Sequence, residues 1–479
     1  MKTVFISGNF NILHPGHIRL FKFAKECGEK LIVGVMSDKL VREKNFLNEL
    51  DRIESINSIS IVDKVVLIND SLKATLNKIK PDIVLKGKEH ETLYNLEAHV
   101  IKKFNGKLIF ASGMSTLSSI SLFNQELSIS KKKNLKLPNK YMSRHKINKD
   151  NIKKIIKKFS KLKVCIIGDL IVDEYIDCNP LGMSQEDPTL VVTPISSDKF
   201  IGGSAIVAAH AAGLGAEVHY VSVSGNDENR KYSKDKLQLY GVNCNIFIDE
   251  SRPTTLKKRY RTENKTLLRV SDLRQHTISK AIQVKIFNKI KKISKNCDLL
   301  IFSDFNYGCL PQNLVNQIIE YSKKNSILMV ADSQSSSQTG NISRFKGMDI
   351  VIPTEREARI SLRNNEDGLV VISDQILQES QSKYVILKLG SDGVLIEDSN
   401  KKQIKKSNDW YTDRLEAFNS SPKDSAGAGD SLLVGSSLTL AVKGSIWESA
   451  LIGSIMSSIQ VSRIGNIPIK VSELIKEFD

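Results

Sequence analysis

The chain has no apolar run that approaches the ~20 residues a membrane-spanning helix needs. Its six cysteines are scattered without a CxxC pair, which argues against a zinc site or a disulfide framework. Free thiols suit a reducing cytoplasm, and the opening MKTVFISGNF lacks the layout of a signal peptide. We find no internal repeat and no Pro/Gly/Ser-rich linker. These absences favour a cytoplasmic protein, and its 479 residues are more than one core usually serves, so two or three domains are expected.

Acidic residues are scarce in one stretch, and this scarcity accounts for most of the positive charge. Residues 131–163 contain fourteen Lys or Arg and one acid, Asp150, and so carry thirteen of the seventeen net positive charges. Two aromatic residues, Tyr141 and Phe159, are few for stacking nucleic-acid bases. We therefore expect a solvated basic linker at 129–162, with contact to an acidic surface, a membrane headgroup or RNA as the alternative.

The second half of this stretch predicts a helix. Its apolar residues follow the spacing i, i+3, i+4, i+7 with lysines on the other face, and they are Ile152, Ile155, Ile156 and Phe159. We expect this helix to dock on the domain that follows or on a partner subunit.

The first ~125 residues alternate between strand and helix patterns. Strands are expected at 3–8, 30–38, 64–68, 81–87 and 107–112, and helices at 17–28, 51–63 and 72–79. Such alternation predicts an α/β domain, placed at 1–128, with a parallel sheet covered by helices on both faces. Ligands of such sheets bind at the carboxyl ends of the strands.

A second α/β pattern begins near Lys163 and continues to the C-terminus, which predicts a further domain at 163–479. Its strand-like segments are 163–175, 298–305, 327–333, 349–354 and 384–396. Residues 254–272 alternate between apolar and polar side chains, which predicts a small antiparallel element such as a lid over the sheet.

Residues 8–17, GNFNILHPGH, place two histidines three apart directly after the first predicted strand. Gly8 permits close approach of the backbone, and a helix that begins near His17 presents free N–H groups and a partial positive charge. Imidazoles there can donate to a phosphoryl oxygen as charge builds in the transition state. For this pattern alone, a helix cap or a packed turn is the alternative.

The wider context resembles the cytidylyltransferase-like nucleotidyltransferases. HPGH at 14–17 is similar to the HxGH motif of that family, and similar elements follow in order at 31–38, 51–66, 81–87 and 113–120. One departure is Asn11, which stands where the family usually has an aspartate and so could alter metal or ligand contacts.

This resemblance implies nucleotidyl transfer, in which a sugar or alcohol phosphate attacks the α-phosphorus of a nucleoside triphosphate and pyrophosphate leaves. It implies that His14 and His17 stabilise the pentavalent phosphorus and that Lys86 assists by holding phosphate oxygens. Further nucleotide or phosphate contacts are implied for Gly8, Asn9, Phe10, Arg52, Ser115 and Thr116. For Arg52, a solvated helix charge stays open as the alternative.

Residues 424–431, DSAGAGDS, put small residues before an acid at a predicted helix start. The backbone N–H groups of Ala426 to Gly429 can form an anion hole. Asp430 is placed where a carboxylate can take a proton from an attacking hydroxyl. A capped turn is the alternative for the bare pattern.

This region resembles the ribokinase-type sugar kinases, whose signature is a D-T-x-G-A-G-D loop. Similar elements occur in order at 168–173, 201–216, 303–305, 351–358 and 388–393, so the match spans about 163–470. The resemblance implies that Asp430 is the catalytic base and that Mg²⁺ bridges the phosphates of ATP near Glu357. Phosphate or nucleotide contacts are implied for Gly427, Ala428, Gly429, Lys388, Gly390 and Gly393. Sugar contacts are implied for Asp169, Asp173, Gly202 and Gly203.

Four segments resemble the kinase of the bifunctional enzymes of ADP-heptose synthesis, and they are 168–175, 183–192, 202–216 and 252–259. Those enzymes join a heptose-7-phosphate kinase to a heptose-1-phosphate adenylyltransferase, normally with the kinase first, so the order here is reversed. The resemblance implies a sugar phosphate and a nucleoside triphosphate as substrates, ATP or else CTP in the transferase, and a homodimer. The concentration of the positive charge in the linker and its few aromatics argue against a nucleic-acid partner.

Four kinase positions depart from the heptose pattern. Ile206 replaces an asparagine, Tyr307 a lysine, Ser333-Gln334 a Pro-Lys pair and Thr354 an asparagine. They leave the sugar open and also admit an alternative, in which the transferase works and a degenerate kinase-like domain binds a sugar phosphate or mediates dimerisation. The expected fold is thus α/β, with a Rossmann-like nucleotidyltransferase domain followed by a ribokinase-like domain that carries a small β lid.

Overall fold

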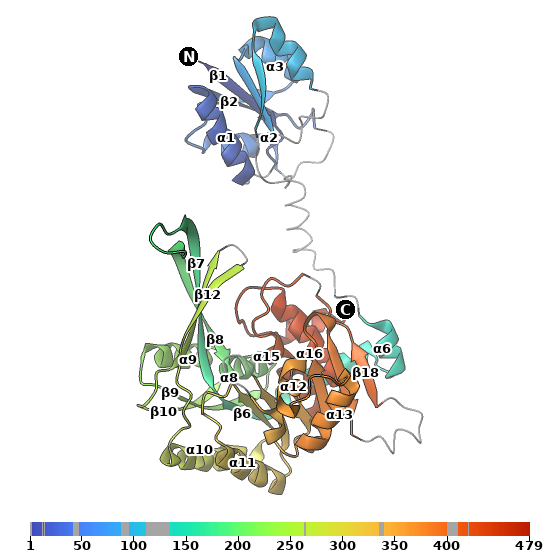
Figure 1. The fold of residues 1–479 in the computed structure, drawn as a ribbon. Helices are drawn as coiled ribbons and strands as arrows, with labels where there is room; N and C mark the ends of the chain where they lie inside the picture. Colours follow the sequence, from blue (N-terminus) through green and yellow to red (C-terminus); the bar gives the residue numbers. More distant parts are fainter. Residues whose placement is uncertain are drawn as a thin grey trace. The chain divides into compact units, whose positions relative to one another are not determined.

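The computed structural model describes residues 2–11, 13, 15–41, 47–87, 95–111, 135, 137–262, 265–334, 340–399, 411–419 and 421–479 (Figure 1). Its contacts divide the chain into two compact units, residues 1–133 and residues 134–479. The second unit therefore includes residues 134–162, which make up most of the predicted linker.

A five-stranded parallel sheet in the order β3-β2-β1-β4-β5 is the frame of the first unit. Its elements are β1 (Thr3–Gly8), α1 (Pro15–Cys27), β2 (Lys30–Met36), α2 (Glu49–Asn57), β3 (Lys64–Ile68), α3 (Leu72–Ile79), β4 (Ile83–Gly87), α4 (Leu96–Ile101), η2 (Lys102–Phe104) and β5 (Lys107–Ala111). The predicted strands and helices of this region are confirmed, apart from shifts of their ends.

Alternate residues of each strand point to opposite faces of this sheet, and both faces are covered. Val4 and Ile6 of β1 pack in one core with Phe21 of α1 and Ile56 of α2. Phe5, between them in sequence, packs in the other core with side chains of α3 and α4. Continuous apolar strands such as VFI therefore suit a sheet between two helical layers.

The second unit is built on a nine-stranded sheet in the order β10-β9-β6-β13-β14-β15-β16-β17-β18, parallel except for the pairs that β17 makes. The strands are β6 (Lys163–Gly168), β9 (Glu217–Ser224), β10 (Asn243–Ile248), β13 (Leu299–Asp304), β14 (Leu328–Ser333), β15 (Ile350–Val351), β16 (Tyr384–Lys388), β17 (Val394–Asp398) and β18 (Thr412–Leu415).

Helices cover both faces of this sheet. One core holds side chains of α7 (Lys149–Lys158), α8 (Ser204–Gly213), α15 (Ala428–Ala441) and α16 (Ile446–Val461). The other holds side chains of α10 (Lys280–Ile293), α11 (Gln312–Lys324), α12 (Glu355–Leu362) and α13 (Leu369–Ser380). The remaining helices are α6 (Asn139–Arg144), η3 (Phe159–Lys161), α9 (Glu228–Leu239), η4 (Ser294–Asn296), η5 (Ile342–Arg344), η6 (Gly390–Asp392) and α17 (Val471–Lys476).

The helix predicted within the basic stretch is confirmed as α7, and it docks on the domain that follows. Asn148 caps it by accepting a hydrogen bond from the backbone N–H of Asp150. Ile152 and Ile156 are buried in the core of the second unit, whereas Lys154 is exposed. The apolar face of α7 is thus core, and its lysines are the solvated face.

A separate four-stranded sheet in the order β12-β11-β7-β8 forms a lid that projects from the body of this unit (Figure 1). The predicted antiparallel element at 254–272 is confirmed as the pair β11 (Thr255–Thr262) and β12 (Lys265–Asp272). The sequence did not show the other half, the long hairpin of β7 (Leu170–Met183) and β8 (Leu190–Gly203).

Candidate active sites

In the first unit, Gly8 and Lys86 lie at the carboxyl ends of β1 and β4, which are neighbours at the point where the strand order reverses. A crevice at such a point is where open α/β sheets bind their ligands. Helix α1 begins at Pro15 beside it, and its first N–H groups have no acceptor within the helix. The geometry therefore suits an anion between these two strand ends.

The loop after β1 turns through Phe10, whose φ of 48° is unusual for a non-glycine residue. The Phe10 ring is buried and packs edge-on against His17, with ring centres 5.2 Å apart. Phe10 therefore fixes the imidazole of His17 from the core side, and the structure gives no support to its predicted nucleotide contact. Asn11 Oδ1 accepts from the backbone N–H of Leu47 at 3.2 Å. His14 lies outside the described residues.

Arg52 is fully buried within the first unit. Its guanidinium donates to the carbonyl oxygens of Asn9 (2.7 Å), Met36 (2.9 Å) and Leu47 (3.2 Å), and it pairs with Asp38. These contacts lie within the protein, so Arg52 is not a solvated helix charge, and they give no support to its predicted phosphate contact. Arg52 instead ties α2 to the loop after β1 and to the end of β2.

Lys86 carries a partner that the sequence did not reveal. Its Nζ lies 2.8 Å from Oε1 of Glu97, which is buried on α4. The pair holds the ammonium group at the end of β4, the strand next to β1. Ser115 and Thr116, the other predicted phosphate ligands, lie outside the described residues.

In the second unit, a cavity of about 1060 Å³ opens at the carboxyl ends of the central strands. The DSAGAGDS loop, the lid and the turn after β16 all contribute to its wall. The loop leads into α15 through Gly427, whose φ of +75° favours glycine. Helix α15 is held close to α16 because Gly435 and Gly453 face each other: a Cβ on Gly435 would lie 2.9 Å from the Cα of Gly453.

Asp430 lies in the first turn of α15 on the cavity wall, and it is 6% exposed. Burial, reinforced by the nearby Asp332 carboxylate, raises its pKa to about 7. Gln334 donates to Oδ1 of Asp430 at 3.1 Å. A carboxylate that is desolvated and held through one oxygen in the first turn of a helix can accept a proton at neutral pH.

Lys388 at the end of β16 also lines the cavity, and it binds both carboxylate oxygens of Asp332 behind it, at 2.9 and 3.0 Å. Burial opposes the charge of Lys388, but the carboxylates of Asp332 and Glu357 raise its pKa above the ordinary value. Burial likewise raises the pKa of Asp332 to about 6 although Lys388 lowers it. We regard the pair as ionised, because two direct bonds join its members.

Glu357 lies on the cavity wall at the start of α12, in a capping box with Thr354. Oε2 of Glu357 accepts from the backbone N–H of Thr354 at 2.7 Å. Among the described residues no group of three or more His, Cys, Asp or Glu side chains could hold a metal ion.

The four predicted sugar ligands lie at the base of the lid but differ in what they contact. Asp173 and Gly203 line the cavity, and Asp173 accepts from Arg259 at 3.4 Å. A Cβ at Gly202 would collide with the Asp173 carboxylate, so this glycine makes room for it. Asp169 instead accepts three backbone N–H groups of loop 305–309. Its contacts support an anchor for that loop rather than a sugar ligand.

The turn after β16 forms the opposite wall. Gly390 and Gly393 line the cavity with φ values of +61° and +91°. A Cβ at Gly393 would collide with the carbonyl oxygen of Leu415, so the turn closes against β18 only with glycine. Val394 and Phe418 beside it supply an apolar surface.

Comparison with known proteins agrees with this geometry. Residues 161–472 match the family described as pfkB family carbohydrate kinase, and residues 5–116 match the family described as cytidylyltransferase-like. The chain belongs to the pfkB carbohydrate kinase family. The predicted fold class is confirmed, as is the order within this chain, with the cytidylyltransferase-like domain before the kinase domain.

Two relatives of this chain are each named bifunctional protein HldE. The protein from Helicobacter hepaticus is 27% identical over 318 residues, and the one from Sulfurimonas denitrificans is 28% identical over 329 residues. The matches cover 66% and 67% of this chain but only 63% and 65% of the relatives. The chain thus matches less than two thirds of the length of these proteins.

Solved structures resemble the chain in fold. Ribokinase of Arabidopsis thaliana, complexed with ribose and ATP, has a TM-score of 0.52 at 16% identity and covers 66% of this chain and 99% of its own. Phosphofructokinase-2 of Escherichia coli, in complex with substrates and products, has a TM-score of 0.54 at 16% identity, with coverages of 66% and 98%. No helix among the described residues is both long and apolar enough to cross a membrane.

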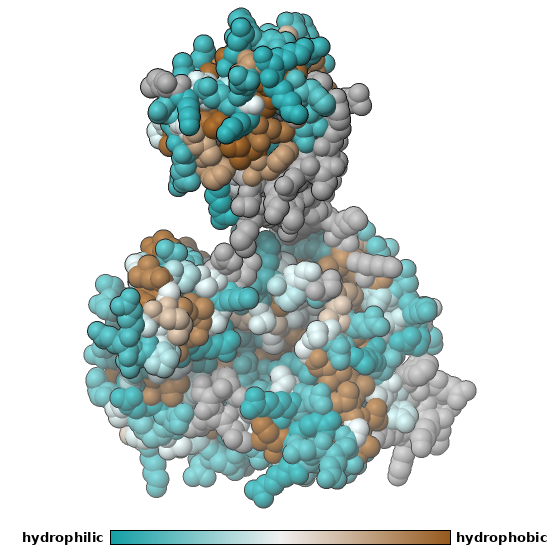
Figure 2. All heavy atoms as spheres, turned by 45° about the horizontal axis from the view of Figure 1, so that its top comes forward, coloured by the Kyte–Doolittle hydropathy of each residue, from teal (hydrophilic) through white to brown (hydrophobic). Residues whose placement is uncertain are grey.

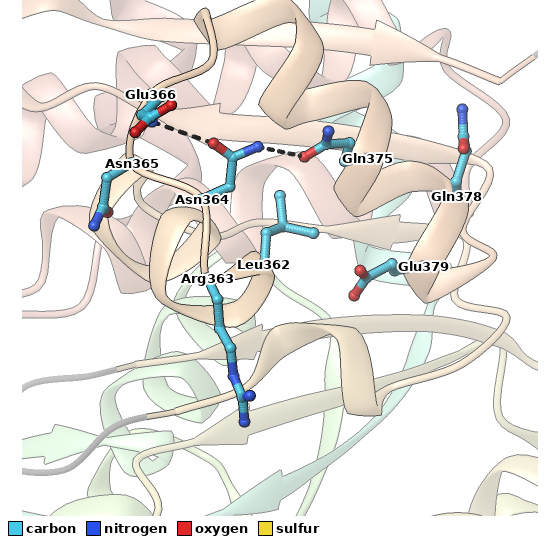
Figure 3. Close-up of a pocket in the computed structure, with 8 residues that line it drawn as sticks. All are labelled: Leu362, Arg363, Asn364, Asn365, Glu366, Gln375, Gln378 and Glu379. Carbon is cyan, nitrogen blue, oxygen red and sulfur yellow. Dashed lines mark hydrogen bonds between the residues drawn. The ribbon is translucent and has the colours of Figure 1, made fainter.

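A second hollow of the second unit, about 700 Å³ in volume, lies between the end of α12 and α13 (Figure 3). The Asn364 side chain in it already accepts from the backbone N–H of Glu366 and donates to Gln375 (Figure 3). Its wall is polar, and it holds none of the predicted site residues.

Sequence reasoning found the loop and the strand ends but missed the side chains that surround Asp430. Asp332 and the lid residues Lys257 and Arg259 were not predicted as site residues, and Gln334 was predicted only as a departure from the heptose pattern near the sugar or phosphate contacts. A signal was present for Gln334, because it directly follows a predicted strand whose carboxyl end faces the site. The roles of the residues predicted from resemblance stay predictions.

Proposed function

We propose that the chain is a bifunctional enzyme that phosphorylates a sugar phosphate in its kinase half and activates a sugar phosphate in its nucleotidyltransferase half. Both matched families and the name of the HldE relatives support this pairing. Since the chain spans less than two thirds of those relatives, the activities rest on its own sites.

For the kinase half, the observation that carries the proposal is Asp430 at the start of α15, buried beside the backbone of Gly427 to Gly429. An acceptor hydroxyl of the sugar attacks the γ-phosphorus of ATP and gives its proton to Asp430. The new O–P bond forms as the bond to the leaving ADP oxygen breaks, and the helix N–H groups neutralise the developing charge. Gln334 holds Oδ1 of Asp430, which leaves Oδ2 for the proton.

The charges of the lid support an acceptor that already carries phosphate. Lys257, Lys258, Arg259 and Arg269 from β11 and β12 line the cavity on the side of Asp173. A neutral sugar would need few cations there, whereas a phosphate dianion is bound by several Lys or Arg side chains. We propose a heptose phosphate or a similar sugar phosphate, on the resemblance of segments such as 202–216 to the ADP-heptose enzymes.

ATP is the proposed phosphoryl donor, and Mg²⁺ is its proposed partner. Glu357, at the cavity wall, would hold the ion through water, and Mg²⁺ would supply neutralisation of the ATP phosphates. The turn 388–393 would hold the nucleotide, with Val394 and Phe418 as an apolar surface for the base.

For the transferase half, the support comes from Gly8 and Lys86 at the reversal point of the sheet and from His17 in the first turn of α1. An oxygen of the sugar phosphate attacks the α-phosphorus of ATP, or of CTP, and pyrophosphate leaves. His17 would donate to the pentavalent phosphorus together with His14, and Lys86 would hold phosphate oxygens.

We further propose a homodimer formed through the lid, in a cytoplasmic setting. Large apolar side chains are exposed on the β7–β8 hairpin: Leu181 (63%), Met183 (63%) and Ile195 (71%). Figure 2 shows apolar side chains gathered on this projecting sheet. A second copy of the lid offers the same apolar strip, so a symmetric contact would remove both from water.

Each half provides the control for the other in the experiment that tests the proposal. Asp430→Asn should lower ADP formation with a panel of sugar phosphates by ~10²-fold or more and leave pyrophosphate release intact. His17→Ala should lower pyrophosphate release by ~10²-fold and leave ADP formation intact. Unchanged ADP formation in Asp430→Asn would refute the kinase assignment, and full pyrophosphate release in His17→Ala would refute that of the transferase.

A further inference from the structure

The Asp332–Lys388 pair joins the carboxyl ends of β14 and β16, which β15 separates in the sheet, beside the loop that leads into α15. Lys388 lines the cavity, whereas Asp332 is 1% exposed and stands behind it. Lys388 Nζ binds Oδ1 and Oδ2 of Asp332 at 3.0 and 2.9 Å. In the described part of the chain these are the hydrogen bonds of this ammonium group. Because an ammonium has three N–H donors, one donor remains for a ligand.

The ammonium also lies against the anion hole. A Cβ built on Gly429 would be 3.4 Å from Lys388 Nζ, so the ammonium group lies beside this glycine of the loop. The carboxylates of Asp332, Glu357 and Asp430 all raise the pKa of Lys388, so it stays protonated despite burial, which acts in the opposite direction. A fixed positive charge therefore borders the N–H groups of residues 427–429.

We propose that Lys388 is a catalytic residue of the kinase half that donates to the phosphoryl group in transfer, and that Asp332 is the positioning residue that holds its ammonium beside Gly429. This inference rests on the proposed kinase function. In the reaction the acceptor oxygen bonds to the γ-phosphorus, its proton passes to Asp430, and the β,γ-bridging oxygen leaves with ADP. Lys388 stays protonated throughout and offsets the charge on the equatorial oxygens.

The neutral side chain at position 334 supports the catalytic role of Lys388. Gln334 follows the same strand as Asp332 and reaches Asp430 with a neutral amide, where the resembling enzymes have a lysine. The site would therefore lack a cation at the end of β14, and Lys388 supplies one from the end of β16, two strands away in the sheet. A lysine whose only task was packing could lie anywhere along β16, but this one lies at the cavity.

Four variants of the full chain test the proposal: Lys388→Met, Asp332→Asn, the double variant, and Lys383→Met as a control. Lys383 directly precedes β16, at its other end, and pairs with Asp349 at 2.6 Å, but it is exposed and lies outside the cavity wall. We expect Lys388→Met to lower kcat by ~10²-fold or more with a smaller change in the KM for ATP. Asp332→Asn should lower kcat by ~10-fold, and the control should match the wild type.

Asp332 acts through Lys388, so its loss should add nothing once the lysine is gone. The double variant should therefore have the kcat of Lys388→Met alone. It also removes both buried charges together, which keeps the fold testable if a single variant leaves one charge unpaired and misfolds. Tryptophan fluorescence reports folding of the second unit, because both tryptophans, Trp410 and Trp447, belong to it.

The pH dependence separates this role from a structural one. The groups that face Asp430 are Asp332 on β14, Lys388 on β16, Asp173 on β7 and Lys257 on β11. Loss of the Lys388 charge raises the pKa of Asp430, so the acidic side of the kcat–pH profile should move to higher pH in Lys388→Met. Asp332→Asn removes a negative charge, so the same side of the profile should move to lower pH. A packing defect would not shift the two profiles in opposite directions.

A folded Lys388→Met or double variant with the kcat of the wild type would overturn the inference, as would pH profiles that move together or stay fixed. The proposed function fails separately: if Asp430→Asn also retains wild-type kinase activity, the kinase assignment itself is wrong. If Asp430→Asn is inactive while Lys388→Met is normal, only the role of Lys388 falls.

Discussion

Replacing Arg52 with methionine should destabilise the first unit by about 3–5 kcal/mol while leaving the second unit unchanged. The guanidinium is fully buried and donates to three carbonyl oxygens, those of Asn9, Met36 and Leu47. Methionine fills much of the volume but donates nothing, so these acceptors lose their donor at ~1–3 kcal/mol each if water does not replace it. Asp38 adds little to this loss, since its side chain is 43% exposed and water can solvate it.

Calorimetry of the full chain should resolve this change. A loss of 3 kcal/mol lowers the midpoint of a unit of this size by about 10 °C. Tryptophan fluorescence, which reports the second unit alone, should stay at its wild-type midpoint. Nucleotidyl transfer below the new midpoint should also decline, because Arg52 fixes the carbonyl of Asn9 in the loop that precedes His17.

The matched control is Lys25→Met in the same unit. Lys25 pairs with Asp63 at 2.6 Å, but the two side chains are 30% and 38% exposed. Such exposed pairs contribute ~0–1 kcal/mol, so the control should barely move the transition. If Arg52→Met costs no more than Lys25→Met, the role assigned to Arg52 is wrong.

Three further predictions concern the kinase half. Kinase kcat should rise with pH through a midpoint near the pKa of Asp430, about 7, because this base acts when it is deprotonated. We would measure kcat over a pH series. A kcat that stays constant well below pH 7 would contradict the prediction. Gln334→Met should move the midpoint of this pH profile to higher pH by up to ~1 unit, or about 1.4 kcal/mol, because the Gln334 hydrogen bond favours the charged form of Asp430. An unchanged midpoint would show that Gln334 is not a partner of the base. Gly393→Ala should destabilise the second unit by ~1–3 kcal/mol, because residue 393 has a φ of +91° and its new Cβ would collide with the carbonyl oxygen of Leu415. Denaturant unfolding measures this change. Gly368→Ala is the control, because a Cβ there would meet open space.

The sequence predicted most strands because their signals are local. Continuous apolar runs bounded by turns mark β1, β13 and β14, and the i, i+3, i+4, i+7 spacing marks α7. The segment 163–175 shows where this approach failed. It reads as one strand, but β6 ends at Gly168 and β7 starts at Leu170 in a different sheet. The division falls at Asp169, whose carboxylate binds a loop more than 130 residues away.

Arg52 illustrates a similar failure at the level of a single side chain. Helical periodicity places it on α2, but its burial depends on carbonyl groups at the ends of β1 and β2. These groups carry no sequence signal, since every residue has a carbonyl. Phe10 and Asp169 were likewise predicted from motifs as ligand contacts, and both are held by contacts inside the protein.

By itself the sequence determined the two α/β patterns, the two glycine-containing loops at helix starts and the position of Asp430, because each depends on residues close together in the chain. Tertiary structure alone decided which charges surround those loops: Glu97 beside Lys86, Asp332 beside Lys388, and Gln334 on Asp430. Parallel strands bring their carboxyl ends to one edge of a sheet, so residues dozens of positions apart become neighbours there. Burial at that edge also shifts the pKa values of Asp332 and Asp430, and burial is a property of the folded chain.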